Sequence, residues 1–287
     1  MAALFEALQS DARLQLPQGY RELGQLVAID GTLIDSVLSM TWADYRQGSR
    51  KAKVHLGFDV NRGIPKKFFL TEGKAGEGPF VSQILDPGET AVLDRYYQCY
   101  RNFDLWQEEG RHFVCRIKAK ARQTPLQEHA VPPDSHVFQD ATVLLGTPGV
   151  NQTGLPVRVV GYQVGRARYW VATDRHDLAA EQVALAYKLR WSVESFFAWW
   201  KRHLKVYHIL AHSRYGLMVQ ILAGLITYLL LAIHCWQEHQ ETVSIKRVRE
   251  LRFRIKNEHA LESRSCGHTL KARARPKKES FEPTAIS

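Results

Sequence analysis

The chain has 287 residues, of which 45 % are hydrophobic and 24 % are charged. These proportions are typical of a globular protein with a sizeable core, and they exclude fibrous, collagenous and largely disordered chains. Lys and Arg number 39 against 29 Asp and Glu, which gives a net charge of +10. Such an excess favours a polyanionic partner, nucleic acid before an anionic membrane surface, over a small-molecule substrate.

The first half of the chain predicts three strands in succession followed by a β-α-β pattern. Residues 1–24 indicate a short helical lead that ends in a turn around Pro17 and Gly19. Later elements are predicted as strands at 25–30, 54–60 and 66–71, a helical turn at 80–85, a strand at 90–94, a helix at 97–109 and a strand at 112–117. This order predicts an α/β fold built on a mixed sheet.

The second half changes first to short strands and then to helices. Strand patterns occur at 137–145, 155–160 and 168–172, and helical patterns at 178–206, from 215 onward and at 243–259. The predicted organisation is a lead at 1–24, a main domain made of 25–119 and 174–240, a β-rich insertion at 120–173, and a basic helix with a disordered tail at 241–287.

One apolar segment allows two interpretations. Residues 217–236 contain no Asp, Glu, Lys or Arg and are long enough to span a bilayer. Gln220 and His234 lie within the segment, and no second segment of this kind is present. A buried core helix is therefore favoured over a membrane anchor.

The predicted compartment is the cytoplasm. The N-terminal sequence has no basic region followed by a long apolar region, so no secretory signal is visible. No C-x-x-C pair occurs among the four cysteines, which are Cys99, Cys115, Cys235 and Cys266. This spacing is typical of reduced thiols inside a cell.

Most of the excess charge lies at the C-terminal end. Residues 246–287 hold twelve Lys or Arg and five Glu, so this segment contributes +7 of the total +10. A run such as 271–278 has no apolar face, and we expect it to be ordered only by a phosphate backbone. The alternative interpretation is a solvated tail that aids solubility.

Two aspartates follow hydrophobic strand patterns directly. Asp30 ends the pattern at 25–30 and Asp94 ends the pattern at 90–94. Each alone could cap a turn. Together with a third carboxylate from a helix that crosses the sheet, they could form an oxygen cage for Mg²⁺ or Mn²⁺, an arrangement suited to phosphodiester cleavage.

The helical segment at 178–206 supplies that third carboxylate. Tyr187, Arg190, Glu194 and Lys201 have offsets of 0, 3, 7 and 14, which on one continuous helix fall in a stripe about 60° wide. Arg190 and Glu194 could instead form an ordinary surface ion pair.

The spacing Y-x2-R-x3-E-x6-K, with the two Asp motifs upstream, resembles the DDE transposases of bacterial insertion sequences, in particular the IS-four family. The residues around Asp94 and the β-rich segment before the Glu helix are also similar to that family, over roughly residues 25–240. The resemblance implies a ribonuclease-H-like mixed sheet, with a β-rich insertion before the Glu-bearing helix and a helical C-terminal part. It also implies cut-and-paste DNA transposition.

The resemblance also implies roles for particular residues. Asp30, Asp94 and Glu194 would be catalytic and would bind two Mg²⁺ or Mn²⁺ ions, which activate water and then the freed 3′-hydroxyl. DNA phosphates would be held by Tyr187, Arg190 and Lys201. A flipped-out base would stack on Tyr169 or Trp170, although a strand aromatic packed inside the insertion is an equal alternative.

Some features depart from the family pattern. Tyr96 replaces the usual Gly after Asp-Arg, and Lys74-Ala-Gly-Glu77 lies near the position of a frequent His-Asp pair. Only 29 residues precede Asp30, where relatives carry a longer helical region that grips the transposon ends. The chain is therefore expected to be a shortened copy, or to recognise the ends through its basic arm.

The expected partners are double-stranded DNA at the element ends and the target, with a homodimer pairing the two ends. Neither a membrane nor a small-molecule substrate is expected, and the location would be the bacterial cytoplasm at the nucleoid. Two alternatives stay open: a truncated, inactive DNA-binding relic, and a metal-dependent endonuclease without strand transfer.

Overall fold

The computed structural model describes residues 1–12, 18–36, 39–131, 133–203 and 211–258. The strands in these ranges are β1 (Leu26–Asp35), β2 (Asp44–Arg46), β3 (Ser49–Asp59), β4 (Ile64–Glu72), β5 (Thr90–Leu93), β6 (His112–Arg116), β7 (Gln123–Glu128), β8 (Val137–Leu145), β9 (Val157–Val164) and β10 (Ala167–Thr173). The α-helices are α1 (Ala2–Asp11), α2 (Val81–Ile84), α3 (Tyr100–Glu108), α4 (Ala180–Lys188), α5 (Trp191–His203) and α6 (Arg214–His239). Short 3-10 helices are η1 (Gln18–Leu23), η2 (Gly78–Phe80) and η3 (Arg95–Tyr97), and residues 245–258 are also helical.

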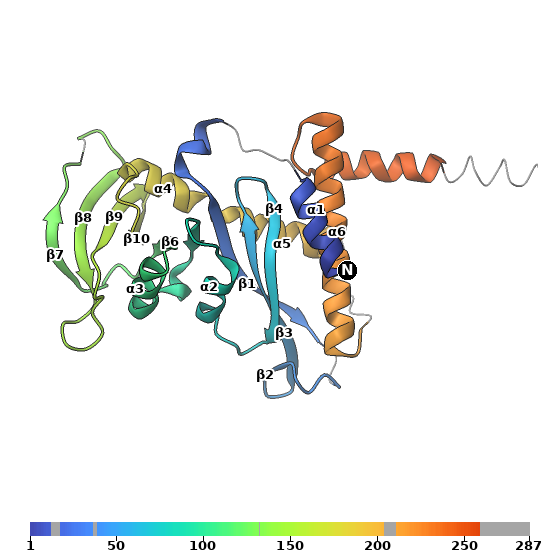
Figure 1. Cartoon of the computed structure of the whole chain (residues 1–287), viewed down its shortest axis with the longest axis horizontal. Helices are drawn as coiled ribbons and strands as arrows, with labels where there is room; N and C mark the ends of the chain where they lie inside the picture. Colours follow the sequence, from blue (N-terminus) through green and yellow to red (C-terminus); the bar gives the residue numbers. More distant parts are fainter. Residues whose placement is uncertain (13–17, 37–38, 132, 204–210, 259–287) are drawn as a thin grey trace, which may run out of the picture.

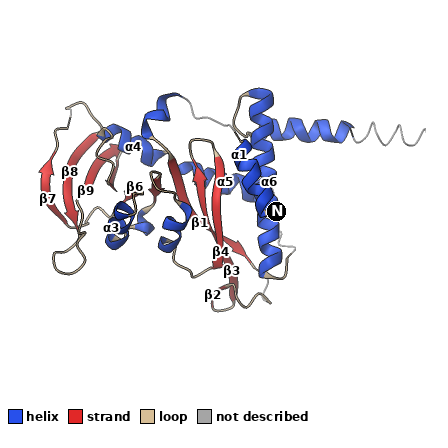
Figure 2. Cartoon of the chain, viewed as in Figure 1, coloured by secondary structure: helices blue, strands red, loops and turns tan. Residues whose placement is uncertain are grey.

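The described strands form one mixed sheet in the order β2-β3-β1-β5-β6-β10-β9-β8-β7, with β4 paired to β3 (Figures 1 and 2). Only the pairs β1·β5 and β5·β6 are parallel among these strands, and the others are antiparallel. The prediction of an α/β fold on a mixed sheet is therefore confirmed.

Helices cover the sheet on two faces. In β1, Leu26 and Ala28 point into a core shared with α1, α4, α5 and α6, whereas Val27 and Ile29 point into a second core shared with α2 and α3. This alternation follows from the period of two along a strand. Both faces of the central strands are covered, which explains their nearly continuous apolar sequences.

The segment predicted as an insertion extends this sheet. Strand β10 pairs antiparallel with β6, with Ala172 opposite Cys115, and β9, β8 and β7 follow outward. The pattern at 123–128 gave no strand prediction because it is polar and contains Pro125. Pro lacks a backbone N–H, so a strand that contains it is tolerated at an edge, and β7 is the outermost strand.

The prediction of one continuous helix at 178–206 is wrong. Two helices, α4 and α5, are separated by a turn at Leu189 and Arg190, where the N–H of Arg190 donates to the carbonyl of Tyr187 at 3.1 Å. Helix α4 packs on β5, β6 and the strands beyond them, while α5 packs on β1 and β3. Because the sheet twists, one straight helix cannot follow both sets of strands. Residues 204–206 of the predicted helix lie outside the described residues.

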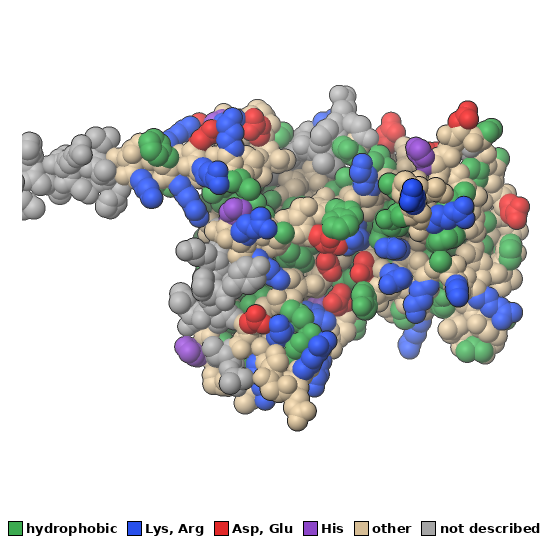
Figure 3. Space-filling view, turned by 180° about the vertical axis from the view of Figure 1, so that it is seen from behind, with side chains coloured by type: hydrophobic (Ala, Val, Ile, Leu, Met, Phe, Trp, Pro, Cys, Tyr) green, Lys and Arg blue, Asp and Glu red, His purple; other side chains and the backbone are tan. Residues whose placement is uncertain are grey.

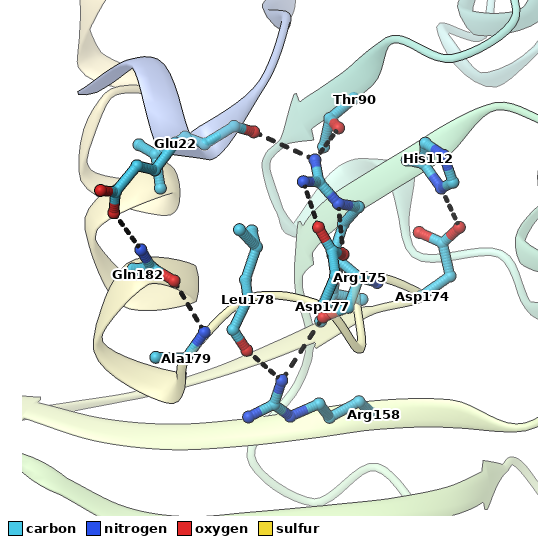
Figure 4. A network of polar contacts seen from close by, with 12 residues as sticks. Glu22, Thr90, His112, Arg158, Asp174, Arg175, Asp177, Leu178, Ala179 and Gln182 are labelled. Carbon is cyan, nitrogen blue, oxygen red and sulfur yellow. Dashed lines mark hydrogen bonds and ion pairs between the residues drawn. The ribbon is translucent and has the colours of Figure 1, made fainter. Parts of the chain in front are cut away.

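A buried polar network fixes the connection from β10 to α4 (Figure 4). The Arg175 guanidinium donates to the carbonyl of Leu23 at 3.0 Å and to the hydroxyl of Thr90 at 2.7 Å, and it pairs with Asp177 at 2.7 Å. Arg158 pairs with buried Asp140 on β8 at 2.7 Å. Since buried charges are stable only when paired and hydrogen-bonded, these contacts hold the start of α4 in one position.

Helix α6 is the one helix of the described residues that is long and apolar enough to cross a membrane. Its Leu217, Ile221, Leu225 and Leu229 are fully buried, and the helix packs on β4 and α1. This packing favours the core-helix interpretation over the membrane anchor. The predicted basic tail beyond residue 258, and Cys266 within it, lie outside the described residues.

Candidate active site

Asp30 and Asp94 lie beside each other on two parallel strands. The register pairs Ala28 with Val92, so Asp30 and Asp94 each stand two residues further along β1 and β5. Ala28 and Val92 point into the core on the α4 and α5 side, and alternation directs both carboxylates to that side. Asp94 directly follows β5, as predicted, but Asp30 does not end a strand. Strand β1 continues to Asp35 because it stays paired with β3 beyond the point where β5 stops.

Burial makes both carboxylates unusually basic. It raises the pKa of Asp30 to about 7, and the negative charges of Glu77 and Asp94 add to the rise. Burial also raises the pKa of Asp94, while the Tyr96 N–H, which donates to Asp94 Oδ1 at 2.7 Å, and the Arg190 charge act in the opposite direction. Two carboxylates that repel each other in a partly dry site are a frequent sign of a functional site.

Glu194 reaches the same place from α5. Its negative charge contributes to the raised pKa of Asp94, so the two carboxylates are electrostatically coupled. The Arg190 guanidinium is buried and forms an ion pair with the Glu194 carboxylate, which is one-third exposed. The Arg190 charge also lowers the pKa values of Asp30 and Asp94. The positive charge of Arg190 therefore acts on all three carboxylates and partly balances their negative charge.

The other residues of the Y-R-E-K spacing are arranged by two helices, not by one helix face. Tyr187 lies at the end of α4, with the Arg190 guanidinium 5.8 Å from the centre of its ring. Lys201, on α5, donates from Nζ to the carbonyl of Leu33 at 3.0 Å, and the negative charge of Asp30 acts on it. The structure thus brings Arg190, Glu194 and Lys201 to the two aspartates and places Tyr187 against Arg190, although the stripe on a continuous helix was wrong.

The two aromatic residues at the end of the insertion point to opposite faces of β10. Tyr169 lines a cavity of about 730 Å³ and stacks on Tyr162, with the two ring centres 5.4 Å apart. Other residues of this aromatic cavity include Tyr187, Trp191 and Lys188. Trp170 instead donates from Nε1 to Gln139 Oε1 at 3.0 Å and packs in the core on the α3 side. The cavity is next to Arg190, whose guanidinium lies 5.4 Å from the Trp191 ring centre.

Two charged residues near the site were not predicted from the sequence to be site residues. Glu77 touches the α3 side of β1, where a Cβ at Gly31 would meet Glu77 Oε1 at 2.5 Å, and its charge raises the pKa of Asp30. Arg116 is the residue after Cys115, which lies opposite Leu93 on the parallel strand β5. Its guanidinium lies 4.8 Å from the centre of the Tyr169 ring. The parallel strands predicted around Asp94 could have indicated Arg116, because neighbouring parallel strands end at one edge.

Acidic side chains gather near the middle of one face of the molecule, with Lys and Arg side chains beside them (Figure 3). A family described as the transposase DDE domain matches residues 21–230 of this sequence. The chain belongs to the DDE transposase family. It is 27 % identical over 235 residues to the protein named as a transposase for insertion sequence element IS5377 of Geobacillus stearothermophilus, covering 80 % of this chain and 62 % of that protein.

The chain is also similar to transposase y4zB of Sinorhizobium fredii, with 27 % identity over 76 % of this chain and 64 % of that protein. The chain therefore spans less than two thirds of the length of these two relatives. Among solved structures, a piggyBac transposase synaptic complex with hairpin DNA matches with a TM-score of 0.47 and 12 % identity, over 79 % of this chain and 51 % of that chain.

DDE transposases generally use divalent metal ions. Within the described ranges, no three His, Cys, Asp or Glu side chains are grouped closely enough to hold an ion as they stand. Glu194 is held by Arg190 instead. The donor chemistry nevertheless fits, because carboxylate oxygens are the ligands that Mg²⁺ and Mn²⁺ prefer, and Asp30 is a buried carboxylate on which the negative charges of Glu77 and Asp94 act.

Proposed function

We propose that this transposase cleaves DNA at the ends of an insertion element and joins the freed 3′-hydroxyl to target DNA. The observation that carries the proposal is the coupling of Asp30, Asp94 and Glu194 at one place on the sheet, with Arg190 among them. An antiparallel meander of β1, β3 and β4, with β5 and β6 added parallel to β1, supports a ribonuclease-H-like fold.

Asp30, Asp94 and Glu194 would hold two divalent ions. Bound there, the ions would lower the pKa of the attacking hydroxyl and stabilise the leaving oxygen. The chain's own residues orient the DNA: Lys201 places a positive charge near Asp30, and Arg190 keeps Glu194 facing Asp94. The Nε of Arg190 is buried without a hydrogen-bond acceptor in the described structure, so this group retains a donor for a phosphate oxygen if the turn at Leu189 shifts.

Tyr169 is the better candidate for stacking on a displaced base. It lines the aromatic cavity together with Tyr162 and Tyr187, and Arg116 lies over its ring at a distance suited to a neighbouring phosphate. Trp170 faces the other core and has its indole N–H occupied by Gln139. Rings that could stack on an unpaired base therefore line a cavity on the Tyr169 side of β10 and not on the Trp170 side.

Replacing Tyr169 with Ala is expected to weaken binding of an element-end duplex about 10-fold, because base–aromatic stacking contributes about 1–3 kcal/mol. Tyr169→Phe should retain the affinity, since the ring stays. The matched change Trp170→Phe should lower the melting temperature and leave the Kd unchanged. Fluorescence anisotropy with a labelled end duplex measures the affinities. Equal Kd values for the wild type and Tyr169→Ala would remove Tyr169 from the DNA site.

We further propose that two copies of the chain pair the two element ends and act in the bacterial cytoplasm at the nucleoid. The excess of positive charge in the sequence supports a DNA partner, because Lys and Arg release counterions from the phosphate backbone. Sedimentation with and without end duplex would report the stoichiometry.

The proposed function is tested by incubating the purified chain with a labelled duplex from the DNA that flanks its gene. Mg²⁺ or Mn²⁺ should produce strand cleavage that EDTA stops, and Glu194→Gln, which keeps the size of the side chain, should not cleave. Added target plasmid should then receive the labelled strand. Cleavage without joining would favour the endonuclease alternative, and binding without cleavage would favour the DNA-binding relic.

A further inference from the structure

A second cavity, of about 820 Å³, opens on the α3 side of the sheet. Its lining includes four cations, which we call the basic groove: Arg101, Lys118, Lys120 and Arg122. All four side chains are exposed, and none has an ion-pair partner among the described residues. The acid of the lining, Asp104, is occupied by the N–H groups of Gly154 at 2.9 Å and Leu155 at 3.0 Å.

The basic groove begins close to Asp94. The carbonyl of Asp94 accepts from the thiol of Cys115 at 3.4 Å, and Asp94 caps η3. Gln98, directly after η3, accepts the backbone N–H of Lys118 through Oε1 at 2.9 Å. The groove and the carboxylates therefore share the edge where β5 and β6 end.

The groove and the aromatic cavity lie on opposite faces of the sheet. Helix α3 buries Phe103 and Trp106 in one core, whereas α4 buries Val183 and Ala186 in the other. The aromatic cavity borders α4, and the basic groove borders α3. The carboxylates thus have a cavity on each side, one lined by aromatic rings and the other by four cations.

The lining of the basic groove suits a phosphate backbone. Its cations are joined by Thr147, Asn151 and Gln152, whose hydroxyl and amide groups commonly bind phosphate oxygens. Contacts of such groups with phosphate oxygens fix the position of the DNA and carry no information on base sequence. A surface of this kind fits DNA of any sequence.

We propose that the basic groove holds one strand of the target duplex that receives the element end. The inference rests on the proposed function, in which end DNA and target DNA must meet at the same carboxylates. In the joining step, the 3′-hydroxyl oxygen of the end bonds to a target phosphorus as the bond from that phosphorus to the target 3′-oxygen breaks. The hydroxyl proton leaves and the displaced 3′-oxygen takes up a proton, with no oxidation and no water consumed.

The test uses the full chain with Lys118→Ala/Lys120→Ala and the charge-matched control Arg46→Ala/Lys67→Ala. Arg46 and Lys67 are exposed on β2 and β4, and neither has an ion-pair partner in the described structure. Two reactions are measured: cleavage of an intact end duplex, and joining of a pre-cut end with a free 3′-hydroxyl to plasmid. The groove variant should join about 10-fold more slowly and cleave within about twofold of the wild type. The control should match the wild type in both.

A loss of equal size in cleavage and joining would overturn the proposal, because the groove would then hold the element end. Unchanged joining would overturn it as well. If the wild type neither cleaves nor joins, the proposed function fails, and the groove is tested by the salt dependence of binding to a non-cognate duplex. The groove variant should then lower the slope of log K against log salt by about 2, and an unchanged slope would reject the groove as a DNA surface.

Discussion

Replacing Asp30 or Asp94 with Asn is expected to reduce DNA cleavage by about 10³-fold or more at pH 7.5 in Mg²⁺. Each substitution removes a negative charge that would hold an ion beside the scissile phosphate, and this ion supplies several kcal/mol of transition-state stabilisation. Binding to an element-end duplex should change by less than about threefold, since phosphate contacts are spread over many cations. Single-turnover cleavage and anisotropy measure the two quantities. Wild-type cleavage by either variant would exclude that residue from the catalytic set.

The melting temperature of the Asp30→Asn variant shows whether a loss of cleavage reflects unfolding. The pKa of Asp30 in the folded chain, about 7, exceeds its ordinary value of 3.8. The folded state therefore holds the proton more tightly than the unfolded chain, and this group makes the protein less stable as pH rises from about 4 to 7. Asn removes that penalty, so metal-free Asp30→Asn should melt about 2–6 °C above the wild type at pH 8. The difference should shrink towards pH 4, and a lower melting temperature at pH 8 would contradict the buried, uncompensated carboxylate.

Replacing Arg190 with Met is expected to lower cleavage by about 10²-fold and to destabilise the chain by about 1–3 kcal/mol. Arg190 is the buried partner of Glu194 and the cation that lowers the pKa values of Asp30 and Asp94. Without it, those pKa values rise further, so the acid limb of the pH–rate profile should move to higher pH. Loss of one phosphate contact alone would lower the rate without moving the limb.

Arg190→Lys separates charge from geometry. Lysine retains a positive charge near the acids but lacks the planar guanidinium that lies against the Tyr187 and Trp191 rings. The acid limb should therefore stay close to that of the wild type, while cleavage remains reduced. As a control, Lys188→Met removes an exposed cation two residues earlier, on α4, and should leave the position of the acid limb unchanged. Identical profiles for Arg190→Met and Arg190→Lys would contradict an electrostatic role.

The sequence predicted the central strands well because each combines a hydrophobic run with a clear stop. The run before Asp94 ends where β5 ends, and the run at 137–145 coincides with β8. Asp30 was misplaced at a strand end because Gly31, which follows it, is a common turn residue. In the structure Gly31 stays in β1, and its missing side chain leaves the space that Glu77 fills. Such a contact joins residues 46 positions apart, which local patterns cannot indicate.

The break between α4 and α5 was not predictable from local propensity. The residues around Leu189 include neither Gly nor Pro, so the sequence alone favours an unbroken helix. The turn follows from how the two helices pack on different strands of a twisted sheet. The sequence also could not show whether Tyr169 or Trp170 faces the site. Strand alternation places the two residues on opposite faces of the sheet but does not indicate which face borders α4.

Because β5 and β10 belong to one sheet, the distance between these two strands is fixed. Strand β6 alone separates β5, which precedes Asp94, from β10, which carries Tyr169. With adjacent strands about 4.8 Å apart, the two strand axes lie about 10 Å from each other and cannot slide independently. If Asp94 and Tyr169 contact the same DNA strand, this fixed distance determines how many nucleotides separate the cut from the displaced base.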